Sequence, residues 1–388
     1  MLLKRFDTPI EEVDLQWLID FGLPESKTLE YKRQIPEPND NGKVKFLKTI
    51  SAFANTDGGD LIFGIDSENG IAKKFAPIEK SDVDTALLRL ESTIASSTEP
   101  RISGVSLQHI ALSCGGSAIV ARVQKSWNSP HRVIVGNHSH FYGRNSAGCY
   151  AMDTSELRRA FTMAYKIADR AGLFRSERFA EYTAYKFPVA MDRRVKIAIH
   201  IMPLSSLMSD KKIDGFDNKE LLRKLAPPGS NNYSCKYNIN GWISFSQTDQ
   251  GASSAFTQLY RNGRIEAVFT PNSPLSNEKI IYPWYEEIII EFLEKSFATL
   301  IDLDVLPPAY IAISVLDAWG YSLVIPNRIN LGNSITEAAS FIVPEVQIDD
   351  FRRHPAHYMR DSFDSVWNAF GHEKSANFNS DGAWSPPV

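Results

Sequence analysis

The sequence is poor in cysteine, with only three residues of this type, Cys114, Cys149 and Cys235. They lie far apart and form no Cys-x-x-Cys pair, so their spacing excludes a zinc ribbon or a disulfide framework. A sparse, odd cysteine count is typical of a reducing compartment. No apolar run approaches the roughly 18 residues that a membrane-spanning helix needs, and the first residues lack the apolar core of a secretion signal. We therefore expect a cytoplasmic protein without membrane contact.

An excess of positive charge is also absent. Lys and Arg number 42 against 46 Asp and Glu, which gives a net charge of −4 and a pI of about 6.1. Proteins that bind nucleic acid strongly and without specificity are usually basic overall. Any nucleic-acid site in this chain must therefore be a local basic patch, or must rely on a metal or a partner.

The usual catalytic signatures are missing. No nucleophile elbow or Ser-His-Asp arrangement is legible. The glycine pair Gly58-Gly59 is not followed by Lys and Ser/Thr in the register of a phosphate-binding loop, which disfavours a P-loop NTPase. His138 and His140, which follow His131, alternate along a predicted strand and could form a pair of ligands, but no third strong ligand lies nearby in the sequence. Exposed hairpin histidines are therefore favoured over a zinc site.

One acidic region is nevertheless distinctive. It contains Glu25, Glu30 and Lys32, and later a helix-like stretch that ends at Gly58-Gly59 and leads through an apolar strand to Asp66. Carboxylate oxygens are the ligands that hard divalent cations prefer, and phosphate-ester chemistry uses such cations. This region is the strongest indication of function in the chain.

The same region resembles the Schlafen AlbA-type domain over about residues 20–165. The resemblance rests on Glu25-Ser-Lys-Thr-Leu-Glu30-Tyr-Lys32 and on Ser51-Ala-Phe-Ala-Asn-Thr-Asp-Gly-Gly-Asp-Leu-Ile-Phe-Gly-Ile-Asp66, with Tyr31 and Ile65 where the family has Phe and Val. It implies an AlbA/Schlafen-like mixed sheet with packed helices. It also implies one of two activities. Some members are metal-dependent endoribonucleases that cut structured RNA such as tRNA, and others are regarded as DNA- or ATP-binding proteins without a known reaction.

For a nuclease, the resemblance implies that Glu25, Glu30 and Asp66 hold Mg²⁺ or Mn²⁺ and that Lys32 neutralises developing charge. The third acid is the weak point of this hypothesis. The family often has two consecutive acids after its Gly-Val, and Ser67 stands at the second position here. Adjacent strand residues point to opposite faces, so Asp66 can replace that acid only through a twist or bulge.

Five residues are candidates for nucleic-acid contact. Lys43, Lys45 and Lys48 lie on one predicted helix. The resemblance also implies an arginine at Arg144, which would contact a phosphate while Tyr142 stacks on a base. The alternatives are a solvated lysine face, a tyrosine at the edge of the core and a structural salt bridge.

The remaining pattern predicts two α+β domains, at residues 1–170 and 180–370, followed by a disordered tail at 371–388. In the first domain we expect helices at 8–21, 43–55, 81–95 and 153–170. In the second, we expect strands at 195–202, 240–246, 264–269, 309–316 and 321–325 and a helix at 285–300. The second domain contains no legible chemical motif. We therefore predict that it binds a partner, most simply a second copy in a dimer or larger homo-oligomer.

The resemblance and the sequence together lead to three hypotheses about function. The first is a nuclease that processes RNA or DNA, for example in prokaryotic defence. The second is a non-catalytic regulator or defence-complex subunit that binds nucleic acid or a nucleotide. The third is an oligomeric assembly protein.

Overall fold

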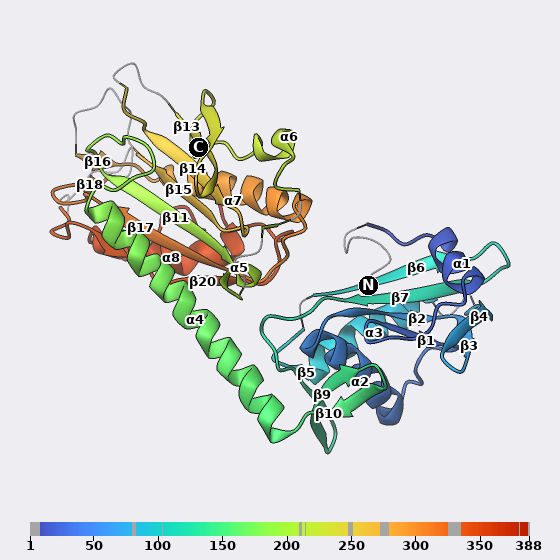
Figure 1. Cartoon of the computed structure of the whole chain (residues 1–388). Coiled ribbons are helices and arrows are strands. Elements are labelled where there is room, and N and C mark those ends of the chain that lie inside the picture. The colour runs from blue at the N-terminus through green and yellow to red at the C-terminus, as the bar shows by residue number, and fades with distance from the viewer. Residues whose placement is uncertain are drawn as a thin grey trace. The chain divides into compact units, whose positions relative to one another are not determined.

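The fold is described from a computed structural model, in which residues 8–79, 83–102, 104–208, 212–213, 215–246, 251–271, 279–324, 335–379 and 381–386 are described (Figure 1). The chain divides into two compact units, Met1–Lys166 and Ile167–Val388. Both units combine helices with sheets, which confirms the predicted α+β class.

The first unit contains two four-stranded sheets and a separate hairpin. One sheet has the order β1-β2-β7-β6, in which β1 and β2 are parallel, and the other has the order β10-β9-β8-β5. The hairpin pairs β3 with β4. The elements are α1 (Glu12–Asp20), β1 (Leu29–Lys32), α2 (Asp40–Asn55), β2 (Gly59–Phe63), β3 (Ile65–Glu68), β4 (Ile71–Phe75), α3 (Val83–Ser97), β5 (Thr98–Glu99), β6 (Val105–Ala111), β7 (Ser117–Val123), β8 (Arg132–Val135), β9 (His138–Asn145) and β10 (Gly148–Ala151).

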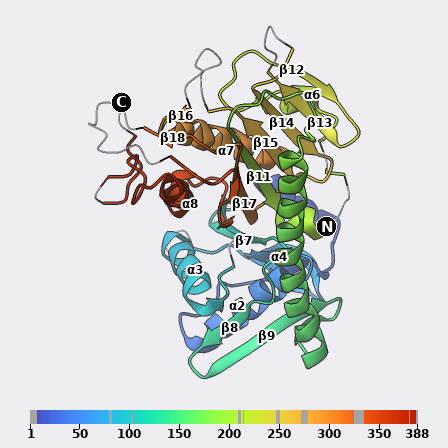
Figure 2. The same ribbon diagram turned by 90° about the vertical axis from the view of Figure 1, so that its left-hand side faces the viewer.

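Helix α2 is the central element of this unit, because it packs against strands of both sheets (Figure 2). The side chain of Asn39 accepts a hydrogen bond from the Gly42 amide at 2.8 Å and so caps its N-terminus. At its C-terminus, the Asn55 side chain donates to the carbonyls of His131 and Tyr142 at 3.1 and 2.9 Å. The motif residue Asn55 therefore ties the helix to the second sheet.

The second unit is built on one antiparallel sheet with the order β12-β13-β14-β15-β11-β17-β19, and β20 also pairs with β17. The long helix α4 (Thr154–Thr183) crosses the boundary between the units. The other elements are β11 (Lys196–Pro203), α5 (Leu204–Met208), α6 (Lys219–Leu222), β12 (Ser234–Tyr237), β13 (Gly241–Phe245), β14 (Ala255–Tyr260), β15 (Ile265–Phe269), β16 (Ile280–Ile281), α7 (Tyr285–Asp302), β17 (Ala309–Leu316), β18 (Ser322–Leu323), β19 (Phe341–Ile342), β20 (Val346–Ile348) and α8 (Ala356–Ala369).

The two faces of this sheet carry different cores. Alternate residues of β11, such as Ile197 and Ile199, belong to the large apolar core that also contains residues of α7 and α8. On the opposite face, Ala198 packs in a smaller cluster with Tyr182 of α4. In Figure 2, α4 accordingly lies on one side of the sheet, and α7 and α8 lie on the other.

The C-terminal segment differs from the prediction of a disordered tail at 371–388. Ser375 and Asn377 are buried, and both donate side-chain hydrogen bonds of 2.8 Å to the carboxylate of Glu286 on α7. Trp384 packs on the large core. The segment has few aliphatic residues, but two polar anchors and an aromatic ring are enough to hold it.

Another difference concerns α4. The helix predicted at 153–170 continues to Thr183, because residues such as Tyr182 pack against the sheet of the second unit. Among the described residues, no helix is both long and apolar enough to cross a membrane.

Candidate functional site

Glu30, the central acid of the sequence motif, lies on β1 and is held by two cations. Lys32 Nζ lies 2.5 Å from its Oε1, and Arg144 Nη1 lies 2.5 Å from its Oε2. Burial opposes ionisation of this carboxyl, but Lys32, and then Arg144, lower its pKa below the ordinary value. Both oxygens of Glu30 are therefore already engaged.

Glu25 has a local structural contact. Its Oε1 accepts a hydrogen bond from the backbone amide of Tyr31 at 2.9 Å, and its own amide donates to the Gly70 carbonyl at 2.7 Å. These bonds fix the start of β1 against the turn between β3 and β4. Glu25 thus stabilises the chain around Glu30.

Asp66 lies at the bulge that the sequence analysis required, since the register of the β3–β4 pair shifts between Asp66 and Ser67. Its carboxylate is 3.5 Å from Arg33 Nη1. Together with Arg33 and Lys74, it lines a cavity of about 620 Å³ in the first unit. This cavity has acids and bases in similar number, so it has no strong charge of either sign.

The donor set does not fit the Mg²⁺ or Mn²⁺ site that the family resemblance implied. Within the described part of the chain, no group of three His, Cys, Asp or Glu side chains is placed to hold one metal ion. Glu25 binds a backbone amide, Glu30 binds two cations and Asp66 faces Arg33. A shared hard cation would need these contacts to be exchanged for metal–oxygen bonds.

Arg144 lies in the interior of the first unit, with 3% of its side chain exposed. Nε and Nη2 donate to the Ser26 carbonyl at 3.2 and 2.9 Å, Nη2 also donates to Leu29, and Nη1 donates to Cys149 Sγ at 3.3 Å. The guanidinium also lies over the ring of Phe53. This is the structural role that we kept as the alternative to a phosphate contact.

Tyr142 is likewise buried, at 7% exposure, and its hydroxyl is 2.8 Å from His138 Nε2. In this position, its ring packs against the rings of His138 and His140. His138 and His140 lie beside it on β9, with ring centroids 4.6 Å apart, and Lys48 of α2 lies 5.4 Å from the centre of the Tyr142 ring. Burial, followed by the charges of His140 and Lys48, lowers the pKa of His138.

The three predicted lysines of α2 are in different surroundings. Lys43 lies 3.3 Å from Asp40, whereas Lys45 is exposed and Lys48 is half-buried at the β9 surface. Lys45 precedes Lys48 by three positions and so shares its side of the helix. Lys45, Lys48, His138 and His140 form a small cationic and aromatic surface, which we call the α2–β9 surface.

The second unit contains a buried polar cluster that no sequence pattern predicted. Glu266 of β15 is fully buried, and Arg178 of α4 donates to both of its oxygens, from Nε at 2.6 Å and from Nη2 at 3.0 Å. His200 of β11 lies beside it, with Nε2 3.4 Å from Glu266 Oε2, although neither ring nitrogen has a hydrogen bond of good geometry. Burial would raise the pKa of Glu266, but His200 and Arg178 lower it to about 2.

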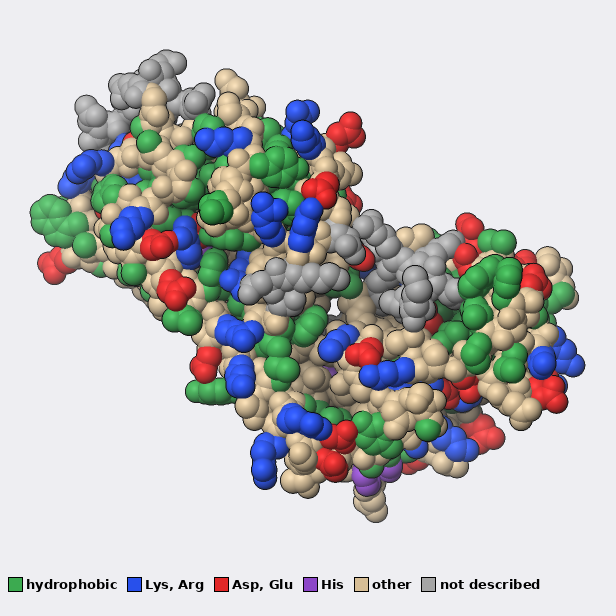
Figure 3. Space-filling view, viewed as in Figure 1, with side chains coloured by type: hydrophobic (Ala, Val, Ile, Leu, Met, Phe, Trp, Pro, Cys, Tyr) green, Lys and Arg blue, Asp and Glu red, His purple; other side chains and the backbone are tan. Residues whose placement is uncertain are grey.

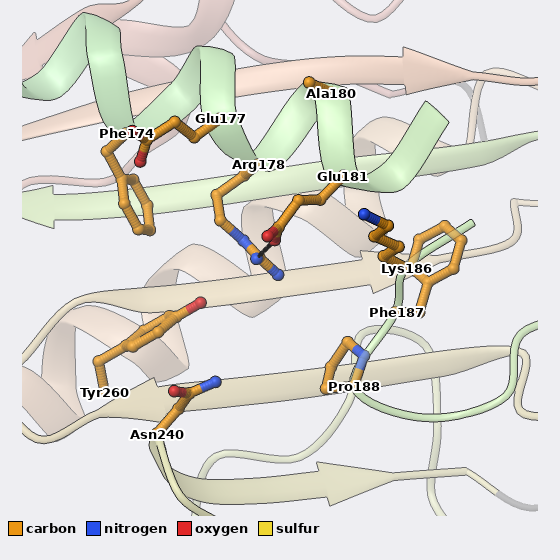
Figure 4. Close-up of a pocket in the computed structure, with 10 residues that line it drawn as sticks. All are labelled: Phe174, Glu177, Arg178, Ala180, Glu181, Lys186, Phe187, Pro188, Asn240 and Tyr260. Carbon is orange, nitrogen blue, oxygen red and sulfur yellow. Dashed lines mark hydrogen bonds and ion pairs between the residues drawn. The ribbon is translucent and has the colours of Figure 1, made fainter. Parts of the chain in front are cut away.

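A pocket of about 690 Å³ lies next to this cluster (Figure 4). Its α4 side includes Phe174, Glu177, Arg178, Ala180 and Glu181. Tyr260 and Asn240 lie opposite, and the segment after α4 contributes Lys186, Phe187 and Pro188. No local signal in the sequence marks this pocket, because its walls come from four separate segments.

One of three comparisons with known proteins falls within the first unit. No curated protein matches the chain. Among solved structures, the chain is similar to the DIP2311 protein from Corynebacterium diphtheriae, with 15% identity and a TM-score of 0.26, over 37% of this chain and 30% of that one. Residues 25–153 match the family model described as Schlafen, AlbA_2. This range contains α2, both predicted glutamates and the α2–β9 surface, and the match confirms the predicted resemblance of this region to the Schlafen AlbA-type domain.

Proposed function

We propose that the first unit binds nucleic acid through the α2–β9 surface and does so without needing a metal. The observation that carries this proposal is the position of Lys48 and the His138–His140 pair around the buried Tyr142 ring, within the region that matches the Schlafen, AlbA_2 family model. Lysines neutralise phosphates, and exposed planar rings provide stacking surfaces for bases. His140, which is exposed, takes the stacking role that the sequence suggested for Tyr142.

The charge distribution supports a small local site. Basic and acidic side chains are interspersed over the face seen in Figure 3. With a net charge of −4, the chain offers little general attraction for a polyanion. We therefore expect modest affinity with a shallow salt dependence, typical of a few phosphate contacts.

Binding is favoured over cleavage by the contacts of the motif acids. Glu30 is engaged by Lys32 and Arg144, and Glu25 holds the Tyr31 amide. A nuclease in which Glu25, Glu30 and Asp66 bind the metal and Lys32 assists remains the second candidate. The bulge at Asp66 is the observation that favours it.

The test is fluorescence anisotropy of the full chain with labelled single- and double-stranded RNA and DNA of equal length, from 50 to 200 mM salt. The double variant Lys45→Ala/Lys48→Ala should weaken binding about tenfold and flatten the salt slope. The double variant Lys224→Ala/Lys295→Ala, with two exposed lysines of the second unit, is the matched control and should bind like the native chain. Equal losses in the two variants would refute the α2–β9 site.

Cleavage is examined on the same panel with and without Mn²⁺. Products that require Mn²⁺ and vanish in Glu25→Gln/Glu30→Gln would replace the binding proposal with the nuclease. These substitutions keep an oxygen acceptor for Tyr31 and Arg144, so loss of activity would not simply report unfolding.

A further inference from the structure

The pocket of the second unit carries an inference of its own. It lies beside a charge cluster that is expensive to bury, because ions lose their hydration in the interior. Buried ionisable groups with shifted pKa values that lie beside a cleft are candidates for functional sites. The side chains of the pocket walls determine which ligand chemistry the pocket can recognise.

The charge of the walls argues against an anionic ligand. Arg178 is the innermost cation, but Glu266 occupies its Nε and Nη2, and its Nη1 is paired with Glu181. The carboxylate of Glu177, by contrast, has no ion pair or hydrogen bond among the described residues, and neither has the amine of Lys186. Once Arg178 is balanced by Glu266, Glu177 and Glu181 face the single charge of Lys186, so the pocket has a net negative charge.

Apart from Asn240, the rest of the lining is aromatic and apolar. Phe174 and Tyr260 are in edge-to-face contact at 5.8 Å, and Phe187 stacks on Tyr182 at 4.7 Å. Figure 4 shows the Glu177 carboxylate beside the Phe174 ring, and Pro188 across the pocket from Tyr260. Aromatic faces together with an unpaired carboxylate are the groups that recognise organic cations, through cation–π and ionic attraction.

We propose that the pocket formed by Phe174, Glu177, Glu181, Phe187 and Tyr260 binds an organic cation, a guanidinium or ammonium group on an apolar stem. Such a group can come from an arginine or lysine side chain of a protein or from a free polyamine. The stem packs on the rings, and the charge pairs with the carboxylate of Glu177. Because this site lies in the second unit, it does not rest on nucleic-acid binding by the first.

The experiment is calorimetric titration of the full chain with N-acetyl-arginine amide, N-acetyl-lysine amide and spermidine. N-acetyl-citrulline amide, which is close in shape to the arginine probe but uncharged, is the reference. We expect saturable binding of the cations and none of the citrulline probe. Tighter binding of the blocked amino acids would indicate a protein side chain as the source, and tighter binding of spermidine a free polyamine.

Two charge-reversal variants locate the site. Glu177→Lys places a cation on the pocket wall and should weaken binding at least about fivefold, as expected when ionic attraction becomes repulsion. Glu287→Lys changes an exposed acid of α7, on the other face of the sheet, and should bind like the native chain. Both positions are exposed, so we expect both variants to fold like the native chain. Their thermal unfolding curves check this.

A second variant tests the aromatic wall. Phe174→Leu keeps an apolar side chain but removes the aromatic face, and should weaken binding about threefold without abolishing it. Equal binding of the citrulline probe, saturable binding of inorganic phosphate at this pocket, or unchanged affinity in Glu177→Lys would each overturn the proposal.

Discussion

Glu30 in the first unit and Glu266 in the second are both carboxylates held by an arginine from a distant segment. Arg144 lies 2.5 Å from Glu30, and Arg178 lies 2.6 Å from Glu266. The sequence motif marked the first pair as functional, whereas nothing local marked the second. Yet Arg144 uses its other N–H groups on the backbone carbonyls of Ser26 and Leu29, while Arg178 lines a pocket. The comparison teaches that the neighbours of an acid decide its role, whatever motif contains it.

The largest effect should come from breaking the second pair. In Arg178→Met, the fully buried Glu266 loses its arginine and keeps His200 and the Tyr260 hydroxyl, which lies 3.4 Å from its Oε1. We expect about 3–5 kcal/mol of lost stability, as for other buried charges that lose their ionic partner. Hydrogen exchange of peptides from β11 and β15, followed as denaturant is added, measures the free energy of unfolding of the second unit alone. Adding Glu266→Gln should restore part of the loss, and a double variant as unstable as the single one would contradict this account.

Acid should weaken the same cluster. The pKa of Glu266 is lowered to about 2 in the folded chain, below its ordinary unfolded value, so its contribution is present above about pH 4.5 and is lost as the pH falls toward 2. The full contribution is about 3 kcal/mol, from the shift of the pKa. Unfolding of the second unit measured between pH 5 and 3 tests it. A Glu266→Gln chain should lose less stability over that range.

Glu286 lies on the other face of the same sheet. Its contribution to stability should change with pH in the direction opposite to that of Glu266. Its partners are the neutral donors Trp367, Ser375, Asn377 and Tyr285. Burial, the dominant influence, raises its pKa to about 7 against these donors. A raised carboxyl pKa means that the folded chain holds its proton more tightly, so this contribution is present at low pH and is lost as the pH rises from about 4.5 through 7.

The measurement is second-unit stability at pH 5.5 and 7.5 in the native chain and in Glu286→Gln. The native chain should gain up to about 2 kcal/mol at the lower pH from this group, and the glutamine variant should lack that gain. A glutamine variant with the same pH dependence as the native chain would show that Glu286 does not titrate in this range.

Breaking the Arg144–Glu30 pair in the first unit should cost less stability than breaking the Arg178–Glu266 pair. Arg144→Met removes the ion pair and leaves the carbonyls of Ser26 and Leu29 without this donor, but Glu30 keeps Lys32 and is 15% exposed. We expect about 2 kcal/mol, below the cost at Arg178. Hydrogen exchange of peptides from β1 and β2 measures this loss of stability. A loss equal to that of Arg178→Met would contradict the expected difference between the two ion pairs.

Sequence patterns predicted the elements whose apolar periodicity is strong. The strand expected at 309–316 has the bounds of β17, and the helix expected at 285–300 begins at the first residue of α7. In both segments, burial alone dictates the pattern. The family run likewise marked α2 and its ending at Asn55, where an amide side chain is needed to reach two backbone groups.

The charge clusters could not be predicted from the sequence, for a physical reason. Arg178 and Glu266 are 88 positions apart, and only the antiparallel pairing of β15 with β11 brings Glu266 opposite His200. Contacts that depend on the register of paired strands correspond to no characteristic spacing in the sequence. The same limit applied to Arg144, for which a phosphate contact and a buried salt bridge are indistinguishable until its depth is known.

The smallest effect on stability should come from Lys32→Ala. Lys32 is 47% exposed, and exposed ion pairs contribute about 0.2–1 kcal/mol, so the loss should stay within about 0.5 kcal/mol. Arg144 still balances Glu30 in this variant. Because the fold is spared, any change in nucleic-acid binding or cleavage reports Lys32 itself. If Lys32 only pairs with Glu30, anisotropy on the RNA and DNA panel will match the native chain. If it neutralises charge on a phosphate, products formed with Mn²⁺ will fall by about tenfold or more at unchanged stability, which would place Glu30 back in a reacting site.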